Sequence, residues 1–177
     1  SFESWELLIV DDGSTDRLEA ALAAYSHDSR IRVFHQKRGR AAAARNVALA
    51  KAGAPLVGYL DSDCVLYPGA LESVCNAFDQ TPRAECLYLA QHWFDPGAGE
   101  GEVRADTFDR LGLMTGRCRV DLNAFFHRHE VYETCGGFDE ELTRLQDLDL
   151  ILRYTEHADP LFVPSLVGRY ELGHFGI

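Results

Sequence analysis

The sequence contains two acidic turns that could bind a cation or a polar ligand. One of them, Asp61-Ser62-Asp63, directly follows residues 56–60, an apolar run typical of a buried strand. Two carboxylates on one short turn repel each other unless a cation joins them, and such a pair can hold Mg²⁺ or Mn²⁺ on a diphosphate. The motif alone also fits a solvated turn that caps the next helix.

The other acidic turn, Asp11-Asp12-Gly13-Ser14, follows the apolar residues 7–10. Side chains of this kind can cap the helix that the next residues predict, so the turn has a structural interpretation as well as a ligand-binding one. Whether the two turns meet depends on the elements that carry them.

Short apolar runs alternate along the chain with stretches of helical spacing. Strands are predicted at residues 7–10, 31–34, 56–60, 86–94, 123–127 and 161–163, and helices at residues 14–25, 41–52, 68–78, 130–135 and 146–157. Residues 95–116, rich in glycine and charge, predict a loop or hairpin. This alternation predicts an α/β fold with a mostly parallel, mixed sheet flanked by helices. Ligands bind beyond the carboxyl ends of such strands, where both acidic turns lie.

Five segments resemble, in order and spacing, the motifs of the family 2 glycosyltransferases. They are Trp5 to Asp16, Arg40 to Asn46, Tyr59 to Asp63, Gly136 to Glu140 and Gln146 to Leu150. The resemblance implies a nucleotide-sugar-binding domain of the glycosyltransferase A (GT-A) type. It also implies an inverting transfer of a sugar from a nucleoside diphosphate donor, with a UDP-sugar expected, to an acceptor hydroxyl.

The resemblance assigns the donor site to the acidic turns and one arginine. Asp12, with Asp11 beside it, matches the acid that contacts the base or ribose, and Arg40 matches a basic position near the base and phosphates. Asp61 matches the ribose-side acid of the Asp-x-Asp motif, and Asp63 matches the ligand of a divalent metal. Mn²⁺ or Mg²⁺ held by these two residues would stabilise the charge of the leaving diphosphate.

Asp147 matches the family's general base, which takes the proton of the acceptor hydroxyl. Inversion requires a base on the face opposite the leaving group, and one carboxylate suffices. Relatives usually carry Glu before this Asp, where Gln146 stands here. Asp149 is the competing candidate, but on a helix it lies four residues before Arg153, where an ordinary ion pair is available.

The helix expected at residues 146–157 has two sides. An apolar stripe that we assign to the core consists of Leu145, Leu148 and Leu152. Asp147 lies on a different side, which could face the cleft, together with Leu150, Ile151 and Tyr154.

Three further polar residues lie near the motifs. His174 is a candidate third metal ligand, if the C-terminal residues fold back over the donor. Arg45 and Asn46 are expected to be structural and to tie their helix to the neighbouring turn.

The composition restricts the partners and the compartment. Lys and Arg number 17 against 28 Asp and Glu, a formal net charge of −11 at pH 7, which disfavours nucleic acid because that binding depends on a basic face. The apolar runs are shorter than the roughly 18–20 residues that cross a bilayer, and no signal peptide is recognised. The five cysteines lack the spacing of a zinc site or a redox motif, so we predict that they fill the core and that the protein lies in a reducing cytoplasm. We expect the full-length protein to be peripheral at a membrane.

The chain begins at Ser1, shortly before its first predicted strand, whereas relatives open with an earlier strand and helix. We expect one GT-A domain over residues 1–177 that lacks these elements, with open strand edges that favour a homo-oligomer or a membrane-associated partner. The expected acceptor is a glycan or glycolipid of a surface polysaccharide or glycolipid pathway. A non-catalytic nucleotide-sugar-binding or assembly module is the alternative. A nucleotidyltransferase is disfavoured, because residues 14–16 are acidic where its phosphate loop would be basic.

Overall fold

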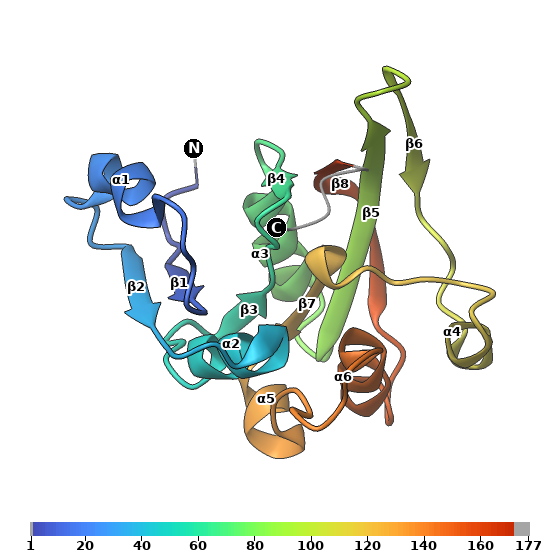
Figure 1. The fold of residues 1–177 in the computed structure, drawn as a ribbon. Helices are drawn as coiled ribbons and strands as arrows, with labels where there is room; N and C mark the ends of the chain where they lie inside the picture. Colours follow the sequence, from blue (N-terminus) through green and yellow to red (C-terminus); the bar gives the residue numbers. More distant parts are fainter. Residues whose placement is uncertain (1, 172–177) are drawn as a thin grey trace.

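The computed structural model describes residues 2–171 (Figure 1). The α-helices are α1 (Leu18–Leu22), α2 (Arg40–Leu49), α3 (Ala70–Gln80), α4 (Arg110–Thr115), α5 (His129–Cys135) and α6 (Gln146–Tyr154). Two 3₁₀ helices are η1 (Ala23–Tyr25) and η2 (Leu122–Ala124). The strands are β1 (Leu7–Asp11), β2 (Ile31–His35), β3 (Leu56–Gly58), β4 (Cys64–Leu66), β5 (Cys86–Asp95), β6 (Glu100–Arg104), β7 (Phe125–Arg128) and β8 (Leu161–Glu171).

The strands form two sheets. β1 and β2 make a two-stranded sheet, and the larger sheet has the order β3-β7-β5-β8-β4, with β6 paired to β5. Within residues 2–171, the pairs β1–β2 and β5–β8 are parallel and the other four pairs are antiparallel. The mixed sheet with flanking helices is confirmed, but parallel pairing is rarer than expected.

The connections between strands explain the antiparallel pairs. A parallel neighbour needs a long crossover, but a tight turn at residues 96–99 joins β5 to β6, so this pair is a hairpin, as residues 95–116 allowed. β8 is longer than the predicted strand at residues 161–163 because it follows β5 from Leu87, opposite Leu161, to Phe94, opposite Glu171. Its length is set by a partner that is distant in the sequence.

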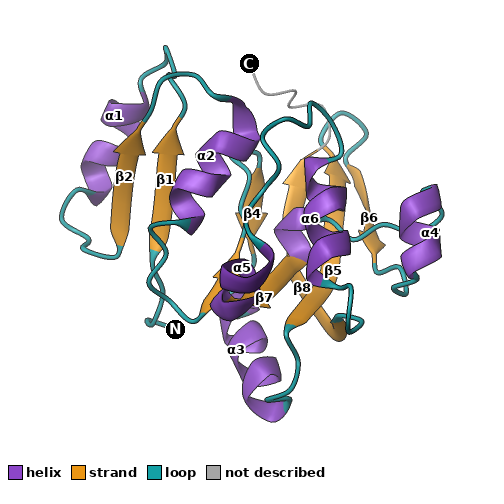
Figure 2. Ribbon diagram, turned by 90° about the horizontal axis from the view of Figure 1, so that it is seen from below, coloured by secondary structure: helices purple, strands orange, loops and turns teal. Residues whose placement is uncertain are grey.

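Helices cover both faces of the larger sheet (Figure 2). Alternate residues of a strand point to opposite faces, and β5 accordingly contributes Cys86 and Tyr88 to one core cluster and Leu87 and Leu89 to the other. The first cluster includes α6 through Leu150, Ile151 and Tyr154. The second includes α3 through Ala70, Val74 and Phe78.

The buried face of α6 agrees only in part with the predicted one. Leu150, Ile151 and Tyr154 are buried, whereas Leu145 directly precedes the helix and is 70% exposed. The predicted stripe is wrong for Leu145, whereas Leu148 and Leu152 are partly buried and pack against the first core cluster. Packing against the sheet, and not apolar spacing alone, selects the residues of the helix that are most buried. Asp147 lies one turn before Ile151, so it belongs to the side that faces the protein interior.

The β1–β2 pair stands apart from the larger sheet, and α2 packs against β1 (Figures 1 and 2). Within residues 2–171, β1 pairs with β2 alone and β3 pairs with β7 alone. Each of these two strands therefore presents one edge without a strand partner in the described part of the chain.

The cysteines follow the core-filler expectation only in part. Cys86 and Cys118 are buried and Cys64 and Cys75 are half-buried, but Cys135 is exposed at the end of α5, so the expectation is wrong for Cys135. No helix in residues 2–171 is both long enough and apolar enough to cross a membrane.

Candidate active site

Asp61 follows β3 on the turn that leads into β4, and two side chains fix its carboxylate. The Asp61 N–H donates to Asn123 Oδ1 (2.6 Å), and Asn123 Nδ2 donates to Asp61 Oδ2 (3.1 Å). Arg45 Nη2 donates to the other oxygen of Asp61, Oδ1 (2.8 Å). Asn123 is only 5% exposed and also donates to Asp121 Oδ1, so the orientation of the Asp61 carboxylate is well defined.

Asp147 lies in the first turn of α6, with its side chain 47% exposed. Arg45 Nη1 donates to Asp147 Oδ1 at 2.7 Å. Burial raises the pKa of Asp147, and the carboxylates of Asp61 and Asp121 add to this effect while the charge of Arg45 opposes it. A carboxylate with a raised pKa is a stronger base, which suits a group that must take up a proton.

The two candidate residues therefore meet at the guanidinium of Arg45, which α2 carries into the site. This side chain is 19% exposed and lies 5.3 Å from the centre of the Phe138 ring. The sequence predicted a structural tie to the neighbouring turn; Arg45 makes such a tie through Asp61 and in addition binds Asp147 of α6. Its pairing with Asp61 and Asp147 is what brings the donor-side motif and the candidate base together.

Asn46 fulfils the structural role expected of it. Its Nδ2 donates to the Phe138 carbonyl (2.9 Å) and to Glu140 Oε1 (2.8 Å), and its Oδ1 accepts from the Phe138 N–H (2.8 Å). Gly137 is required beside it, because a Cβ there would lie 2.3 Å from Asn46 Oδ1. These contacts fix the Gly-Gly-Phe-Asp-Glu turn to α2 and thereby to Arg45.

Asp63 stands on the same turn as Asp61 but points to a different partner. Cys64 Sγ donates to Asp63 Oδ1 at 3.7 Å. Burial, together with nearby carboxylates, raises the pKa of the Cys64 thiol to about 12, so the thiol is protonated and is a poor metal ligand at neutral pH. Within residues 2–171, no group of three or more His, Cys, Asp or Glu side chains is arranged to hold a metal ion. His174, the expected third ligand, lies outside the described residues.

The oxygen donors of this turn nevertheless fit Mg²⁺ or Mn²⁺. Mg²⁺ usually keeps several waters and binds through one or two carboxylates and the phosphates of a substrate, without a cage of protein ligands. Burial raises the pKa of Tyr170, and the nearby carboxylates of Asp63, Asp121 and Asp61 raise it further. Such an excess of negative charge at one corner of the sheet is compatible with a divalent cation.

Asp12 is engaged in structural contacts in this structure. It accepts hydrogen bonds from the N–H groups of Gly39 (2.6 Å) and Arg40 (2.9 Å) and from Gln36 Nε2 (2.7 Å). Burial works against ionisation, but these hydrogen bonds lower the pKa of Asp12 overall. Asp12 therefore holds the start of α2 in place and does not cap α1.

Asp11 and Arg40 complete the predicted donor-binding set. Asp11 Oδ1 accepts from the Ser14 N–H (2.8 Å), which is the main cause of its lowered pKa, and Asp11 Oδ2 lies 3.1 Å from His35 Nδ1. Arg40 has a left-handed backbone (φ 75°) and an exposed side chain. The donor-binding roles of Asp11, Asp12 and Arg40 stay predictions.

The competing carboxylate of α6 has a partner of its own. Arg153 Nε and Nη2 donate to Asp149 Oδ2 at 2.9 and 2.8 Å, so the predicted ion pair is confirmed. Gln146 Nε2 donates to the Leu142 carbonyl at 2.6 Å. Asp147 is thus the carboxylate of this helix that is linked to Asp61.

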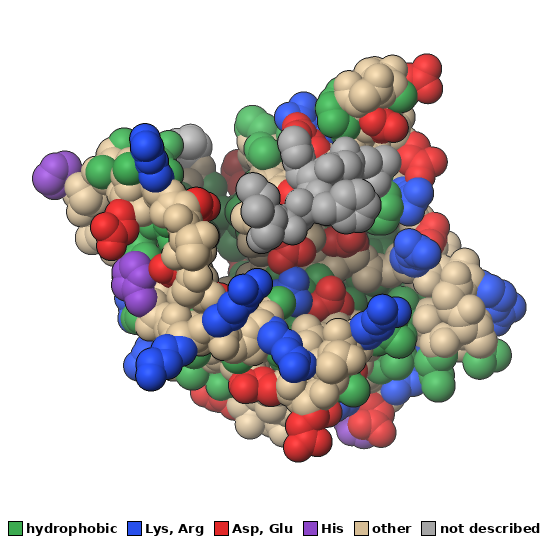
Figure 3. Space-filling view, in the orientation of Figure 1, with side chains coloured by type: hydrophobic (Ala, Val, Ile, Leu, Met, Phe, Trp, Pro, Cys, Tyr) green, Lys and Arg blue, Asp and Glu red, His purple; other side chains and the backbone are tan. Residues whose placement is uncertain are grey.

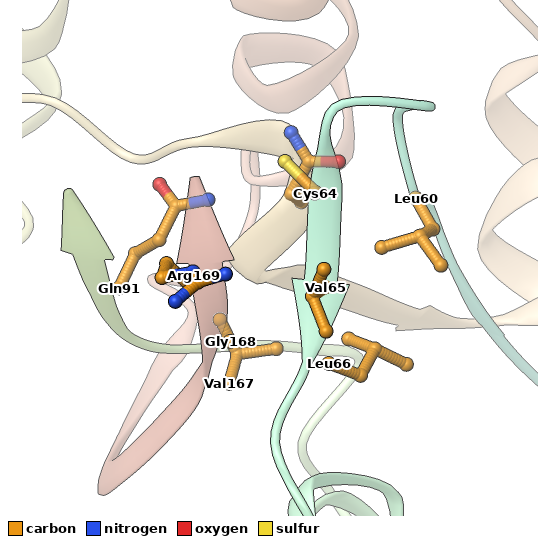
Figure 4. Close-up of a pocket in the computed structure, with 9 residues that line it drawn as sticks. Leu60, Cys64, Val65, Leu66, Gln91, Val167, Gly168 and Arg169 are labelled. Atoms are coloured by element: carbon orange, nitrogen blue, oxygen red, sulfur yellow. The ribbon is translucent and has the colours of Figure 1, made fainter. Parts of the chain in front are cut away.

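The surface agrees with a polar site beside α2. Figure 3 shows acidic and basic side chains close together in a recess above α2, on the face of the molecule that it draws. A small pocket lies where β4 pairs with β8 (Figure 4). Its lining contains no carboxylate and consists of Leu60, Cys64, Val65, Leu66, Gln91, Asn123, Val167, Gly168 and Arg169. This pocket adjoins the site through Asn123, which binds Asp61, but neither Asp61 nor Asp147 lines it.

Two residues of the site were missed by sequence reasoning. Asn123 is buried and binds Asp61, and Asp121 in turn binds Asn123. The available signal was a pair of polar residues, Asp121 and Asn123, inside the apolar stretch 120–126. Buried polar side chains need partners, so such a pair points to a network that the sequence does not name.

Known proteins share both the sequence pattern and the fold. A sequence model of Glycosyl transferase family 2 matches residues 1–117. Chondroitin synthase of Pasteurella multocida (strain Pm70) is 29% identical over 157 residues, which are 85% of this chain and 16% of that protein. Putative glycosyltransferase EpsE of Bacillus subtilis (strain 168) is 26% identical over 164 residues, 89% of this chain and 59% of EpsE. The chain thus spans less than two thirds of either relative.

Among solved structures, S. aureus TarS 1–349 is similar with a TM-score of 0.75 at 19% identity, covering 94% of this chain and 51% of that one. The same protein in complex with UDP-GlcNAc gives a TM-score of 0.77 at 18% identity, covering 97% of this chain and 50% of that one. At this identity the likeness establishes the fold, which is of the GT-A type. The family match, which extends over more than half of the chain, then shows that the chain belongs to the family 2 glycosyltransferases.

Proposed function

We propose that this chain transfers a sugar from a nucleoside diphosphate sugar, with UDP as the expected nucleotide, to a hydroxyl group of an acceptor glycan or glycolipid. The observation that carries the proposal is the meeting of Asp61 and Asp147 at one guanidinium. It brings the candidate donor-side acid to the candidate base. The relative named a chondroitin synthase and the complex of TarS with UDP-GlcNAc support this class of reaction and donor.

Asp147 acts in this proposal as the general base. Arg45 holds its Oδ1, and within residues 2–171 its Oδ2 has no hydrogen-bond partner, so Oδ2 can accept a proton. As the acceptor oxygen bonds to the anomeric carbon, its proton passes to Asp147. The bond from this carbon to the diphosphate oxygen breaks on the opposite face, so the configuration inverts and the nucleoside diphosphate leaves with the electron pair.

The acidic turns hold the donor in this proposal. Asp63, with Asp61 beside it, would hold Mn²⁺ or Mg²⁺, which supplies Lewis-acid stabilisation of the leaving diphosphate when it is bound. Asp12, Asp11 and Arg40 would contact the nucleoside side of the donor. Because the Asp12 carboxylate already orders the start of α2, these contacts would form on a loop that is partly organised before the donor arrives.

Replacing Asp147 with Asn tests the reaction, because the amide keeps the shape of the side chain and cannot take the proton. In the whole natural protein, we expect transfer to fall by about 10²- to 10⁴-fold, with the affinity for UDP and metal close to that of the wild type. Asp149→Asn, two residues away on the same helix, is the matched control. Loss of transfer in Asp149→Asn but not in Asp147→Asn would show that the base is wrongly assigned.

The metal is tested by binding alone. Calorimetric titration with UDP in Mn²⁺ should show metal-dependent binding that Asp63→Ala abolishes. Equal affinity in the wild type and in Asp63→Ala would contradict the assignment of Asp63. If the wild type bound UDP in Mn²⁺ and transferred no sugar, the non-catalytic binding module would be the better description. A cytoplasmic, membrane-peripheral location and a homo-oligomer stay predictions.

A further inference from the structure

Arg45 differs from the other arginines of the site region in joining two carboxylates from different motifs. Its Nη1 donates to Asp147 Oδ1 (2.7 Å) and its Nη2 to Asp61 Oδ1 (2.8 Å). The guanidinium is planar and rigid, so two oxygens bound to its two terminal nitrogens have a set separation and orientation. The position of one carboxylate therefore constrains the position of the other.

The guanidinium is itself held firmly. Arg45 lies in the middle of α2, which is anchored in the core by Ala42 and Leu49, each 2% exposed. The next residue, Asn46, makes three hydrogen bonds to the turn at residues 138–140. Arg45 is less exposed, at 19%, than either carboxylate that it binds, at 40% for Asp61 and 47% for Asp147. The arginine is thus the better-buried partner in both ion pairs.

The contacts continue on the far side of Asp61. Asn123 takes the second carboxylate oxygen, Oδ2, and the N–H of the same residue. The four side chains form a chain in the order Asn123, Asp61, Arg45 and Asp147, which we call the carboxylate chain. It starts from a buried residue of η2 and ends at the exposed edge of Asp147, where an acceptor could reach.

We infer that Arg45 is a positioning residue that holds the Asp147 carboxylate at a fixed distance and orientation relative to the donor-side Asp61. This inference rests on the proposed function, because it assigns the two carboxylates to the two sides of one transfer. Arg45 leaves Asp147 Oδ2 free for the acceptor proton and fixes the direction in which that oxygen points. A misplacement of about 1 Å in such a group can cost about 10²-fold in rate.

Arg45→Lys tests the geometry, because the lysine side chain keeps the charge but is a point donor that cannot hold two carboxylates in one plane. With the whole protein and a UDP-sugar, we expect Arg45→Lys to lower kcat by about 10- to 100-fold. The donor KM should change by less than about 3-fold, because Arg45 does not contact the donor in this assignment. Arg153→Lys is the matched control, since Arg153 also pairs with an Asp of α6 but lies outside the carboxylate chain. It should leave kcat close to the wild type.

A second variant keeps the inference testable if the lysine is poorly tolerated in a partly buried ion pair. Arg45→Ala removes the side chain, and guanidinium ion at low millimolar concentration should then restore part of kcat without raising the activity of the wild type. Thermal unfolding of each variant separates loss of fold from loss of positioning.

Three outcomes would overturn the inference. If kcat is unchanged in Arg45→Lys and Arg45→Ala while the wild type transfers sugar, the positioning role is wrong and the proposed function stands. If donor affinity falls and kcat is kept, Arg45 binds the donor and does not position the base. If the wild type binds UDP in Mn²⁺ without transferring sugar, the proposed function fails and this inference fails with it.

Discussion

The β1–β2 layer and the larger sheet are packed very differently. From residue 2 to residue 41 no side chain is buried, and the buried core begins at Ala42. The larger sheet, in contrast, buries six consecutive residues of β5, from Cys86 to Gln91. Since buried apolar area is the main source of folding free energy, most of the stability of this domain lies in the larger sheet.

This difference divides the candidate site as well. Asp11 and Asp12 belong to the lightly packed layer, where hydrogen bonds to Ser14, Gly39 and Arg40 hold them. Asp61 and Asp147 belong to the well-packed part and are joined through Arg45. Regions with few buried contacts open at lower free energy than the core. We therefore expect the nucleoside side of the site to move more readily than the side that carries the base.

The largest effect is expected from a matched pair of phenylalanine substitutions. Phe125 in β7 is fully buried, whereas Phe34 in β2 is half-buried. Phe125→Ala should lower the free energy of unfolding by about 3–5 kcal/mol, and Phe34→Ala by less than half as much, because less apolar surface is lost. Urea unfolding at neutral pH measures both. Equal losses would show that the β1–β2 layer is packed as tightly as the larger sheet.

A smaller effect is expected from pH, through His127 of β7. This histidine is fully buried, its Nδ1 donates to the Arg128 carbonyl (2.8 Å), and the Tyr59 hydroxyl lies 2.9 Å from its Nε2. Burial lowers the pKa of His127 from 6.5 to about 4. Between these values the unfolded chain binds more protons, so stability is lost as the pH falls, by about 3 kcal/mol at pH 4.

The measurement compares urea unfolding of the wild type and His127→Gln from pH 7 to about pH 4. Carboxylates with lowered pKa values, such as Asp11 and Asp28, act in the same direction in both proteins, so the difference between the two curves reports His127. His27→Gln, at an exposed position, controls for the substitution itself. Parallel curves for wild type and His127→Gln would rule out this contribution.

The smallest of the three effects concerns the link between the two regions. Asn46 fixes α2, which packs against β1, to the turn at residues 138–140. Asn46→Ala should lower the free energy of unfolding by about 1–3 kcal/mol, because it leaves buried backbone groups of Phe138 without partners. Asn76→Ala, on the exposed side of α3, should stay within about 0.5 kcal/mol. An Asn46→Ala loss no greater than that of Asn76→Ala would show that the link is dispensable.

The elements with a strong local pattern were predictable from the sequence. β1, β5, α2 and α3 lie close to the residues where apolar runs and helical spacing predicted them. β4 and most of β8 were not predicted, because their strand character comes from pairing with each other and with β5. The predicted core stripe of α6 left out its most buried residues, Leu150, Ile151 and Tyr154, for the same reason, since the sheet decides which side of that helix is covered most fully.

The candidate site also contains residues that the sequence could indicate and residues whose roles only the fold reveals. The family resemblance pointed to Asp61 and Asp147 and favoured Asp147 over Asp149, in keeping with the separate ion pair that Asp149 makes with Arg153. The roles of Arg45 and Asn123 could not be read from spacing, because their partners are brought close only by the fold. For Asp12, the resemblance predicted a donor-binding role, and the structure adds hydrogen bonds to the start of α2 that the resemblance did not indicate.

The pairing of β5 with β8 has a consequence for the order of synthesis. Residues 86–90 leave the ribosome well before residues 125–128 and 161–171, which supply the two strands that pair with this part of β5. During that interval the apolar segment Cys86–Ala90 has neither partner strand, and such a segment favours association with other chains or with a chaperone. A nascent chain halted before residue 125 should therefore bind an Hsp70-type chaperone at this segment, and one that extends past Glu171 should release it.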